Sequence, residues 1–216
     1  MTTDHDQFRR KAEGWSEREY ADGHAYLDHR ADVVVELGPR LQPGDEVLDL
    51  ACGDGGLGPY LVRRGLRYRG VDLTPEMVAE AGRRLGDAAA VEVGGLDDYT
   101  PPAPVAATTV FRAIYYASDR RAFFERVAMF TTRKLVFDLN PRQYALGEIL
   151  DDLRAAGFDA VQVRPFFVPQ RVALPPPVSA VFRALERSGP FARLLLRVRF
   201  TYLVAAWRSG PGPAGP

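Results

Sequence analysis

The chain is short of the residues that form disulfides and bind metals. Cys52 is the single cysteine among 216 residues, so no disulfide can form within the chain. The sequence has only three histidines, and it shows no grouping of ligand residues with metal-site spacing. No basic residue stands beside Cys52 in the sequence, so we interpret it as a small packing residue rather than a nucleophile. We therefore expect no metal and no cysteine chemistry.

Long apolar runs and an excess of charge are also missing. No stretch approaches the roughly 18 consecutive apolar residues of a membrane-spanning helix, and the polar segment 1–15 lacks the apolar run of a signal peptide. The 28 basic and 28 acidic residues give a formal net charge of +0, which provides no general attraction to nucleic acid or acidic lipid. We expect a cytoplasmic protein without nucleic-acid partners or stable membrane insertion.

The pattern of apolar residues predicts one α/β domain. A chain of this length that is 46% hydrophobic can bury one core. An N-terminal helix is predicted from Asp6 to Leu37, and short apolar strands then alternate with helices, which is typical of a largely parallel sheet. The predicted strands are residues 47–51, 68–71, 90–93, 105–111, 134–139 and 158–163, and the helices between them are residues 57–62, 75–85, 119–130 and 141–156.

The C-terminal part departs from this alternation. A proline-rich segment and an apolar helix, residues 179–196, precede a final strand over residues 197–207. No ordinary crossover leads into that strand, so we expect it to pair antiparallel. The result is a doubly wound, seven-stranded mixed sheet with helices on both faces.

We divide the chain into three parts. Residues 1–40 form an N-terminal helical cap, residues 41–208 form the main domain, and residues 209–216 form a tail. The tail is rich in glycine and proline, a composition typical of disorder. Within the main domain, residues 164–196 are an insertion that we interpret as a lid, with a dimer contact or a membrane-leaning helix as alternatives.

A glycine-rich turn follows the first predicted strand. VLDLACGDGGLG, residues 47–58, has glycines at the spacing G-x-G-x-x-G, which suits a turn that approaches an adenosine-containing ligand. Asp49 lies inside the strand, where a carboxylate would repel the pyrophosphate of a dinucleotide and attract a sulfonium. Asp72 ends the second strand, where it can accept both hydroxyls of a ribose. Asp72 fits either ligand, whereas Asp49 favours S-adenosylmethionine over a dinucleotide.

The motifs together resemble those of the class I S-adenosylmethionine-dependent methyltransferases that act on small molecules. VLDLACGDG and GVDLTPEMVAEA are similar to the first two motifs of that family, with Ala51 in place of the commoner glycine. EVGGLDD, FRAIYYASD and LRAAGF are looser matches to later motifs. The resemblance implies a Rossmann-like fold, S-adenosyl-L-methionine as cofactor, S-adenosyl-L-homocysteine as product, and a small-molecule acceptor.

Sequence position and resemblance together assign a set of residues to the cofactor. Leu73 and Leu96 would enclose the adenine, and Phe111 would lie beside the sulfonium amino acid. Many family members carry an acidic residue where this chain has Gly94 and Gly95, so Asp97 or Asp98 would have to replace it. The full set of cofactor candidates is Asp49, Ala51, Gly53, Gly55, Asp72, Leu73, Leu96 and Phe111. Turn, cap or core positions are the alternative for each of them.

The acceptor site is expected beside the fourth and fifth strands. The residues that follow these strands are Arg112, Tyr115, Tyr116 and Asn140, with Asp138 as an alternative to Asn140. An N-terminal helix that could close over the site adds Tyr20, Tyr26 and His29. Core packing, ion pairing or simple exposure would explain the same residues without a substrate, and we assign no general base.

A small-molecule methyltransferase is therefore the preferred interpretation. A cofactor-binding regulatory or scaffold domain without turnover is the alternative, followed by an NAD-dependent oxidoreductase. We expect a monomer or a homodimer.

Overall fold

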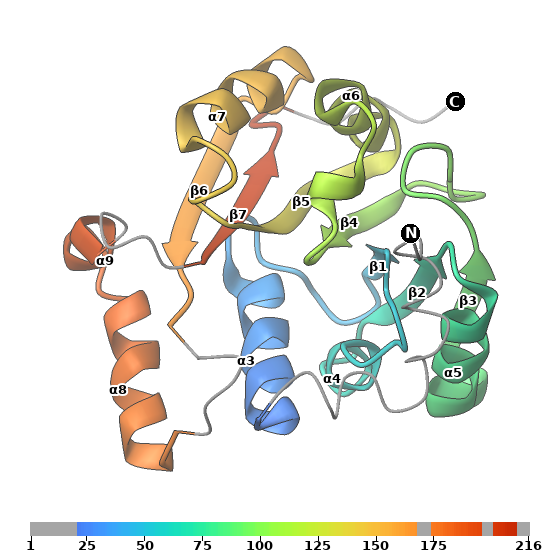
Figure 1. Cartoon of the computed structure of the whole chain (residues 1–216), viewed down its shortest axis with the longest axis horizontal. Helices are drawn as coiled ribbons and strands as arrows, with labels where there is room; N and C mark the ends of the chain where they lie inside the picture. The colour runs from blue at the N-terminus through green and yellow to red at the C-terminus, as the bar shows by residue number, and fades with distance from the viewer. Residues whose placement is uncertain (1–20, 168–173, 196–200, 211–216) are drawn as a thin grey trace, which may run out of the picture.

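Seven strands form one sheet, in the order β3-β2-β1-β4-β5-β7-β6, within the residues that this computed structural model describes, 21–167, 174–195 and 201–210 (Figure 1). The strands are β1 (Glu46–Leu50), β2 (Arg67–Asp72), β3 (Ala89–Val93), β4 (Val105–Val110), β5 (Thr131–Leu139), β6 (Ala160–Pro165) and β7 (Tyr202–Trp207). Neighbouring strands pair parallel except for β7, which is antiparallel to both β5 and β6. The predicted mixed sheet with a final antiparallel strand is confirmed.

Helices cover both faces of this sheet (Figure 1). One layer contains α3 (Gly23–Glu36), α4 (Gly58–Val62) and α5 (Pro75–Leu85), and the opposite layer contains α6 (Arg120–Phe130) and α7 (Leu146–Ala155). Two further helices, α8 (Pro176–Glu186) and α9 (Pro190–Leu195), lie at the end of the sheet that β6 forms (Figure 1).

Alternating side chains of the central strands build the two halves of the core. In β5, Leu135 and Phe137 belong to the apolar cluster with α6 and α7, whereas Val136 belongs to the cluster with α3 and α4. In β7, Val204 joins the first cluster and Leu203 the second. All five side chains are fully buried. Strands that are covered on both sides therefore read as nearly continuous apolar runs.

The helix predicted over residues 141–156 begins later than expected. Asn140 starts a turn in which its carbonyl accepts hydrogen bonds from the amides of Gln143 and Tyr144, at 3.0 and 3.2 Å. Because of this turn, α7 begins only at Leu146.

The helix predicted over residues 179–196 is two helices. α8 ends at Glu186 and α9 begins at Pro190, because Gly189 has a φ of 62° and proline cannot continue the preceding helix. The start of the predicted N-terminal helix, the start of the final strand and most of the predicted tail fall on residues 6–20, 197–200 and 211–216, which lie outside the described residues.

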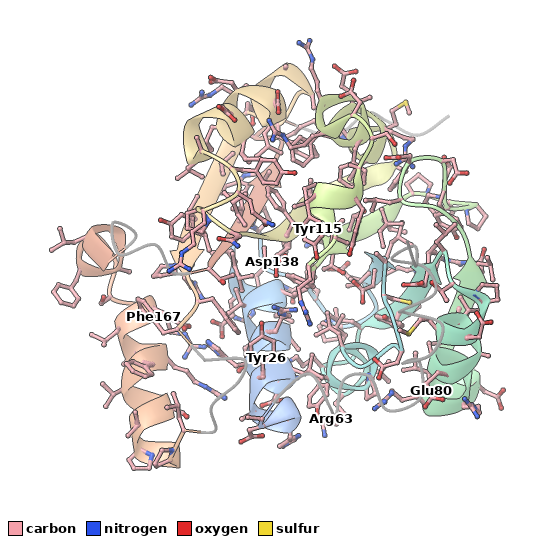
Figure 2. The ribbon with its side chains drawn as sticks, in the orientation of Figure 1. Tyr26, Arg63, Glu80, Tyr115, Asp138 and Phe167 are labelled. Carbon is pink, nitrogen blue, oxygen red and sulfur yellow. The ribbon has the colours of Figure 1, made fainter. Side chains whose placement is uncertain are left out.

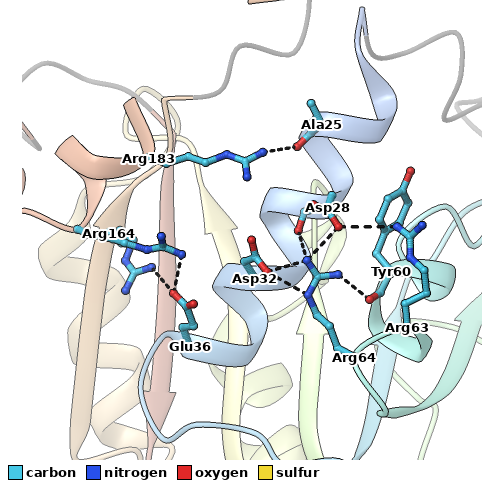
Figure 3. A network of polar contacts seen from close by, with 10 residues as sticks. Ala25, Asp28, Asp32, Glu36, Tyr60, Arg63, Arg64, Arg164 and Arg183 are labelled. Carbon is cyan, nitrogen blue, oxygen red and sulfur yellow. Dashed lines mark hydrogen bonds and ion pairs between the residues drawn. The ribbon is translucent and has the colours of Figure 1, made fainter. Parts of the chain in front are cut away.

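Polar contacts fix α3 to its neighbours (Figure 3). Arg64, just beyond α4, donates to the carboxylates of Asp28 and Asp32, at 2.9 and 2.6 Å. Lys134 of β5 donates to the Leu37 carbonyl at 2.7 Å, which satisfies a carbonyl at the C-terminal end of α3. Burial lowers the pKa of Lys134 to about 7. The described part of the predicted cap is therefore an integral layer on the sheet.

The described part of the insertion packs against α3. The Nε2 atom of His29 lies 2.5 Å from a carboxylate oxygen of Glu186, and both residues are 2% exposed or less. The other oxygen of Glu186 accepts the Phe167 amide hydrogen at 2.7 Å. On its other side the His29 ring stacks on Phe166, with 5.1 Å between centroids. The expectation that His29 faces the substrate is therefore not met, because its ring is buried between α3 and α8.

Two structural findings concern membranes and metals. Among the described helices, none combines the length and apolar character that crossing a bilayer requires. In the same part of the chain, no group of three or more His, Cys, Asp and Glu side chains is arranged to hold a metal ion.

We expect Glu186→Ala to lower the free energy of unfolding by about 3 kcal/mol, because it removes one partner of a buried pair and leaves the Phe167 amide without its acceptor. Urea denaturation would measure the change. Glu125→Ala is the matched control, since Glu125 forms an exposed pair with Arg121 and its loss should cost at most about 0.5 kcal/mol. Equal effects of the two substitutions would contradict a structural role for the buried pair.

Candidate functional site

The candidate site lies where β1 and β4 end. From β1 the chain continues towards one edge of the sheet, and from β4 it continues towards the other. Such a place is a topological switch point, where ligands of doubly wound sheets bind. The chain turns sharply after both strands, since Ala51 and Arg112 have φ values of 58° and 57°. Among the described residues these are the only non-glycine positions with a positive φ, and a left-handed conformation costs such a residue about 1–2 kcal/mol. Glycine would avoid this cost, which explains why it is the commoner residue at the Ala51 position.

The glycines of the first turn serve different purposes. Gly53 has a φ of 58°, and a Cβ atom there would meet nothing within 4 Å, so the turn is open at this point. A Cβ at Gly55 would lie 2.9 Å from the Cβ of Ala81, and one at Gly58 would lie 2.7 Å from the Leu85 side chain. Gly55 and Gly58 therefore allow α5 to pack closely, whereas Gly53 leaves space for a ligand. For Gly55, which we expected to line the ligand, the structure provides a packing role.

Asp72 and Leu73 end β2 beside this turn. The Asp72 carboxylate accepts the amide hydrogens of Gly53 and Thr74, each at 2.9 Å. These bonds hold the carboxylate next to the open turn, where its partly exposed oxygens can accept further hydrogens from hydroxyls. Leu73 is 52% exposed and offers an apolar surface that suits a flat ring.

Asp49 is buried beneath the turn, with 4% of its surface exposed. Its carboxylate accepts the hydroxyl hydrogens of Tyr68 and Thr109, at 2.8 and 2.7 Å. Burial raises the pKa of Asp49 to about 6, against the lowering effect of these two hydrogen bonds and of the Arg30 charge. Both partners are side chains, so these contacts do not hold the amides of the loop.

The segment after β3 is tied to neighbouring elements. Asp97 accepts hydrogens from the Ser118 amide and hydroxyl, at 3.1 and 2.6 Å, so its carboxylate already has a structural task. Arg126 of α6 donates to the Leu96 carbonyl and fixes the backbone at this adenine candidate. Asp97 and Asp98 are both exposed. Of these two acids considered for the adenine amino group, Asp97 is the one held by the hydrogen bonds from Ser118.

A pocket of about 220 Å³ lies at the ends of β4 and β5. Figure 2 labels three of its lining residues, Tyr26, Tyr115 and Asp138. Four of the expected acceptor residues line the pocket, namely Tyr26, Arg112, Tyr115 and Asn140. The other lining residues are Ile114, Asp138, Gln143, Tyr144 and Thr201. The sequence pattern did not point to Gln143 and Tyr144, because the predicted helix over 141–156 concealed the turn that brings them to the pocket.

Two of the expected acceptor residues that the structure describes, Tyr116 and His29, do not belong to this lining. Tyr116 contacts Tyr115, with 4.5 Å between ring centroids, but is 46% exposed outside the pocket. His29 is buried against α8. Tyr20 lies outside the described residues.

Charge in the pocket is concentrated around Asp138. One of its carboxylate oxygens accepts the Arg112 amide hydrogen at 2.6 Å, and the other lies 3.5 Å from a guanidinium nitrogen of the buried Arg30. Burial raises the pKa of the Tyr115 phenol well above its ordinary value. Tyr115 is therefore a neutral hydrogen-bond donor at neutral pH and not a phenolate.

Comparison with known proteins finds similarity to methyltransferases. A family profile described as a methyltransferase domain matches residues 47–133. The chain is 28% identical over 180 residues to trans-aconitate 2-methyltransferase of Mycobacterium tuberculosis, a match that covers 82% of this chain and 57% of that protein. These matches, together with the fold, support a class I S-adenosylmethionine-dependent methyltransferase. It spans little more than half the length of this relative.

Solved structures share the methyltransferase fold. A TehB-like S-adenosylmethionine-dependent methyltransferase from Corynebacterium glutamicum aligns with a TM-score of 0.64 at 14% identity, covering 93% of this chain and 99% of that one. Magnesium protoporphyrin IX methyltransferase from Synechocystis, solved with bound S-adenosylmethionine, aligns with a TM-score of 0.63 at 17% identity, covering 96% of this chain and 92% of that one. The Rossmann-like fold class inferred from the sequence is thereby confirmed.

The profile match divides the site of this methyltransferase into two parts. Residues 47–133 contain the open turn, Asp72 and Arg112. Tyr26, Asp138 and Asn140 lie outside that range, so much of the acceptor pocket comes from parts of the chain that the profile does not cover.

We expect Gly53→Ala and Gly58→Ala to fail in different ways. Gly53→Ala should cost about 1 kcal/mol of stability through its left-handed φ, yet its methyl group enters the open turn and should weaken binding of S-adenosylhomocysteine about tenfold or more. Gly58→Ala pushes against Leu85 and should cost about 1–3 kcal/mol of stability without changing the affinity of the folded protein.

Urea denaturation and calorimetric titration of both variants would separate the two effects. If Gly53→Ala bound S-adenosylhomocysteine as tightly as the wild type, the open turn would not be the cofactor site.

Proposed function

We propose that the protein transfers a methyl group from S-adenosylmethionine to a small, polar acceptor. The observation that carries this proposal is the position of two features at one edge of the sheet. The open turn at Gly53 follows β1, and the polar pocket at Arg112 follows the neighbouring strand β4. A cofactor and an acceptor bound at these two places would meet at the switch point.

The residues around the open turn fit this cofactor. Gly53 leaves free space, Asp72 is oriented to accept ribose hydroxyl hydrogens, and Leu73 presents apolar surface to an adenine ring. Asp49 adds a negative charge beneath the turn above its pKa of about 6. A negative charge there favours a cationic sulfonium and disfavours the pyrophosphate of a dinucleotide.

The chain's part in the reaction is to align the acceptor and exclude water. When bound, S-adenosylmethionine supplies an activated methyl group, whose transfer to the acceptor atom leaves the neutral sulfide S-adenosylhomocysteine. Alignment of this kind can provide about 7–11 kcal/mol of the barrier. Arg112, Tyr115 and Asn140 line the pocket with hydrogen-bond donors that would orient the acceptor. We assign no general base, and an acceptor that is already a carboxylate would need none.

The pocket favours a small and polar acceptor. Its volume of about 220 Å³ is below the roughly 300–1,000 Å³ of sites for drug-sized ligands. Ile114 is alone among the described lining residues in having no polar group on its side chain. Such a lining suits neither a long acyl chain nor a macrocycle of the kind that the Synechocystis neighbour is named for. The Arg112 cation and the relative named for trans-aconitate both support an acceptor with carboxylate groups.

Other features inferred from the sequence belong to the same proposal. We propose that the protein works in the cytoplasm as a monomer or homodimer, without a nucleic-acid partner. We also propose that the N-terminal cap, residues 1–40, and the insertion, residues 164–196, influence access to the pocket through α3.

The first test is calorimetric titration with S-adenosylhomocysteine, with NAD as the control ligand. We expect the wild type to bind S-adenosylhomocysteine and not NAD. Asp72→Ala should weaken binding about 10–100-fold, because hydrogen bonds to a charged group contribute about 1.5–3 kcal/mol. Asp151→Ala, which removes an exposed carboxylate on α7, should leave the affinity unchanged. Binding of NAD instead would contradict the proposed cofactor.

The second test concerns the acceptor. The protein would be incubated with methyl-labelled S-adenosylmethionine and, separately, trans-aconitate, a low-molecular-mass metabolite extract, palmitate, and a protein and nucleic-acid fraction. We expect label in trans-aconitate or in the metabolite extract. Label only in palmitate or in macromolecules would contradict the small polar acceptor, and binding of S-adenosylhomocysteine without any transfer would favour the non-catalytic alternative.

A further inference from the structure

We infer that Arg30 of α3 is a positioning residue, which holds the Asp138 carboxylate and the Tyr26 hydroxyl in place at the acceptor pocket. The inference rests on the proposed function, since it concerns the acceptor half of that site. It adds a residue that neither the motifs nor the residues lining the pocket include.

Arg30 is a buried cation at the centre of an aromatic cluster. Only 2% of its surface is exposed. Its guanidinium carbon lies 4.4 Å from the ring centroid of Phe111, 4.7 Å from that of Tyr26 and 5.7 Å from that of Phe166. Cation–π contacts offset part of the cost of removing the charge from water, and polar partners must offset the rest.

The polar partners of Arg30 include two residues that line the pocket. Its Nη2 atom donates to the Tyr26 hydroxyl oxygen at 2.5 Å and lies 3.5 Å from the Oδ2 atom of Asp138. Tyr26 and Asp138 come from α3 and β5, on different parts of the chain. One guanidinium therefore joins the helix to the strand at the wall of the pocket.

Asp138 links Arg30 to the backbone of Arg112. While its Oδ2 atom faces Arg30, its Oδ1 atom accepts the Arg112 amide hydrogen at 2.6 Å. Arg112 is one of the two non-glycine residues with a left-handed φ among those described. A guanidinium, a carboxylate and a backbone amide thus form a chain of contacts that ends on the strained residue of the acceptor loop.

The charge of Arg30 also lowers the pKa of Asp49 against the effect of burial. Its charge therefore acts on the acidic group under the open turn as well as on Asp138. A residue needed only for packing would not require a cation at this position.

The experiment that tests this inference is amide hydrogen exchange of the full-length protein, measured by NMR. Arg30→Met keeps most of the apolar volume and removes the charge, whereas Arg30→Lys keeps the charge. We expect Arg30→Met to speed exchange at the Arg112 amide about tenfold, as expected for the loss of one hydrogen bond, while the amides of β1 and β5 stay within about threefold of the wild type. Arg30→Lys should restore part of the protection.

Two results for Arg30→Met would overturn the positioning role of Arg30. Unchanged exchange at Arg112 in Arg30→Met would overturn it, and so would an equal increase at every amide, which would indicate a purely structural role. If Arg30→Met does not fold, Asp138→Asn is the second variant, and it should speed exchange at Arg112 in the same selective way. Absence of this selective effect would also overturn the inference.

Titration of the same samples with S-adenosylhomocysteine separates this inference from the proposed function. We expect the affinity of Arg30→Met to fall less than that of Asp72→Ala, because Arg30 contacts the acceptor half directly and reaches the cofactor half only through the effect of its charge on Asp49. A wild type that does not bind S-adenosylhomocysteine would contradict the proposed cofactor and leave the exchange result at Arg112 valid.

Discussion

The divergence of the chain at β1 and β4 is the constraint on which the candidate site depends. These two strands are neighbours, yet their connections lead to opposite ends of the sheet, because β1 continues to β2 and β4 continues to β5. Right-handed crossovers on opposite faces leave a crevice between the two loops. The left-handed residues Ala51 and Arg112 stand at the two sides of this crevice. The sheet beneath them provides the stability that makes such strained turns tolerable.

Burial of polar side chains in and around α3 determines how the crevice is enclosed. A helix packed on a sheet by apolar contacts alone can slide with little loss, whereas buried polar groups require specific partners. Arg30, His29 and Lys134 are all buried, and each has a partner on another element or at a helix end. These contacts give α3 a defined position, and with it the Tyr26 wall of the pocket. Glu186, from the insertion, contacts His29 of the same helix.

The two halves of the site are built in different ways. The cofactor half comes from short, local segments, in which the turn at Gly53 and the carboxylate of Asp72 lie directly after adjacent strands and are joined by one hydrogen bond. The acceptor half is assembled from α3, the loop after β4, the turn after β5 and the residue before β7. Changes in these separate elements can alter the acceptor without disturbing the cofactor half.

The sequence by itself determined the alternation of strands and helices, the antiparallel final strand, the glycine-rich turn and the position of Asp72, because each depends on local periodicity or turn chemistry. It also pointed to Tyr26, Arg112, Tyr115 and Asn140. Only the tertiary structure decided that Gly55 serves helix packing, that His29 binds Glu186, and that the Arg30 guanidinium contacts the Asp138 carboxylate. The reason is that these contacts join residues far apart in the chain, and no local pattern specifies which buried charge meets which partner.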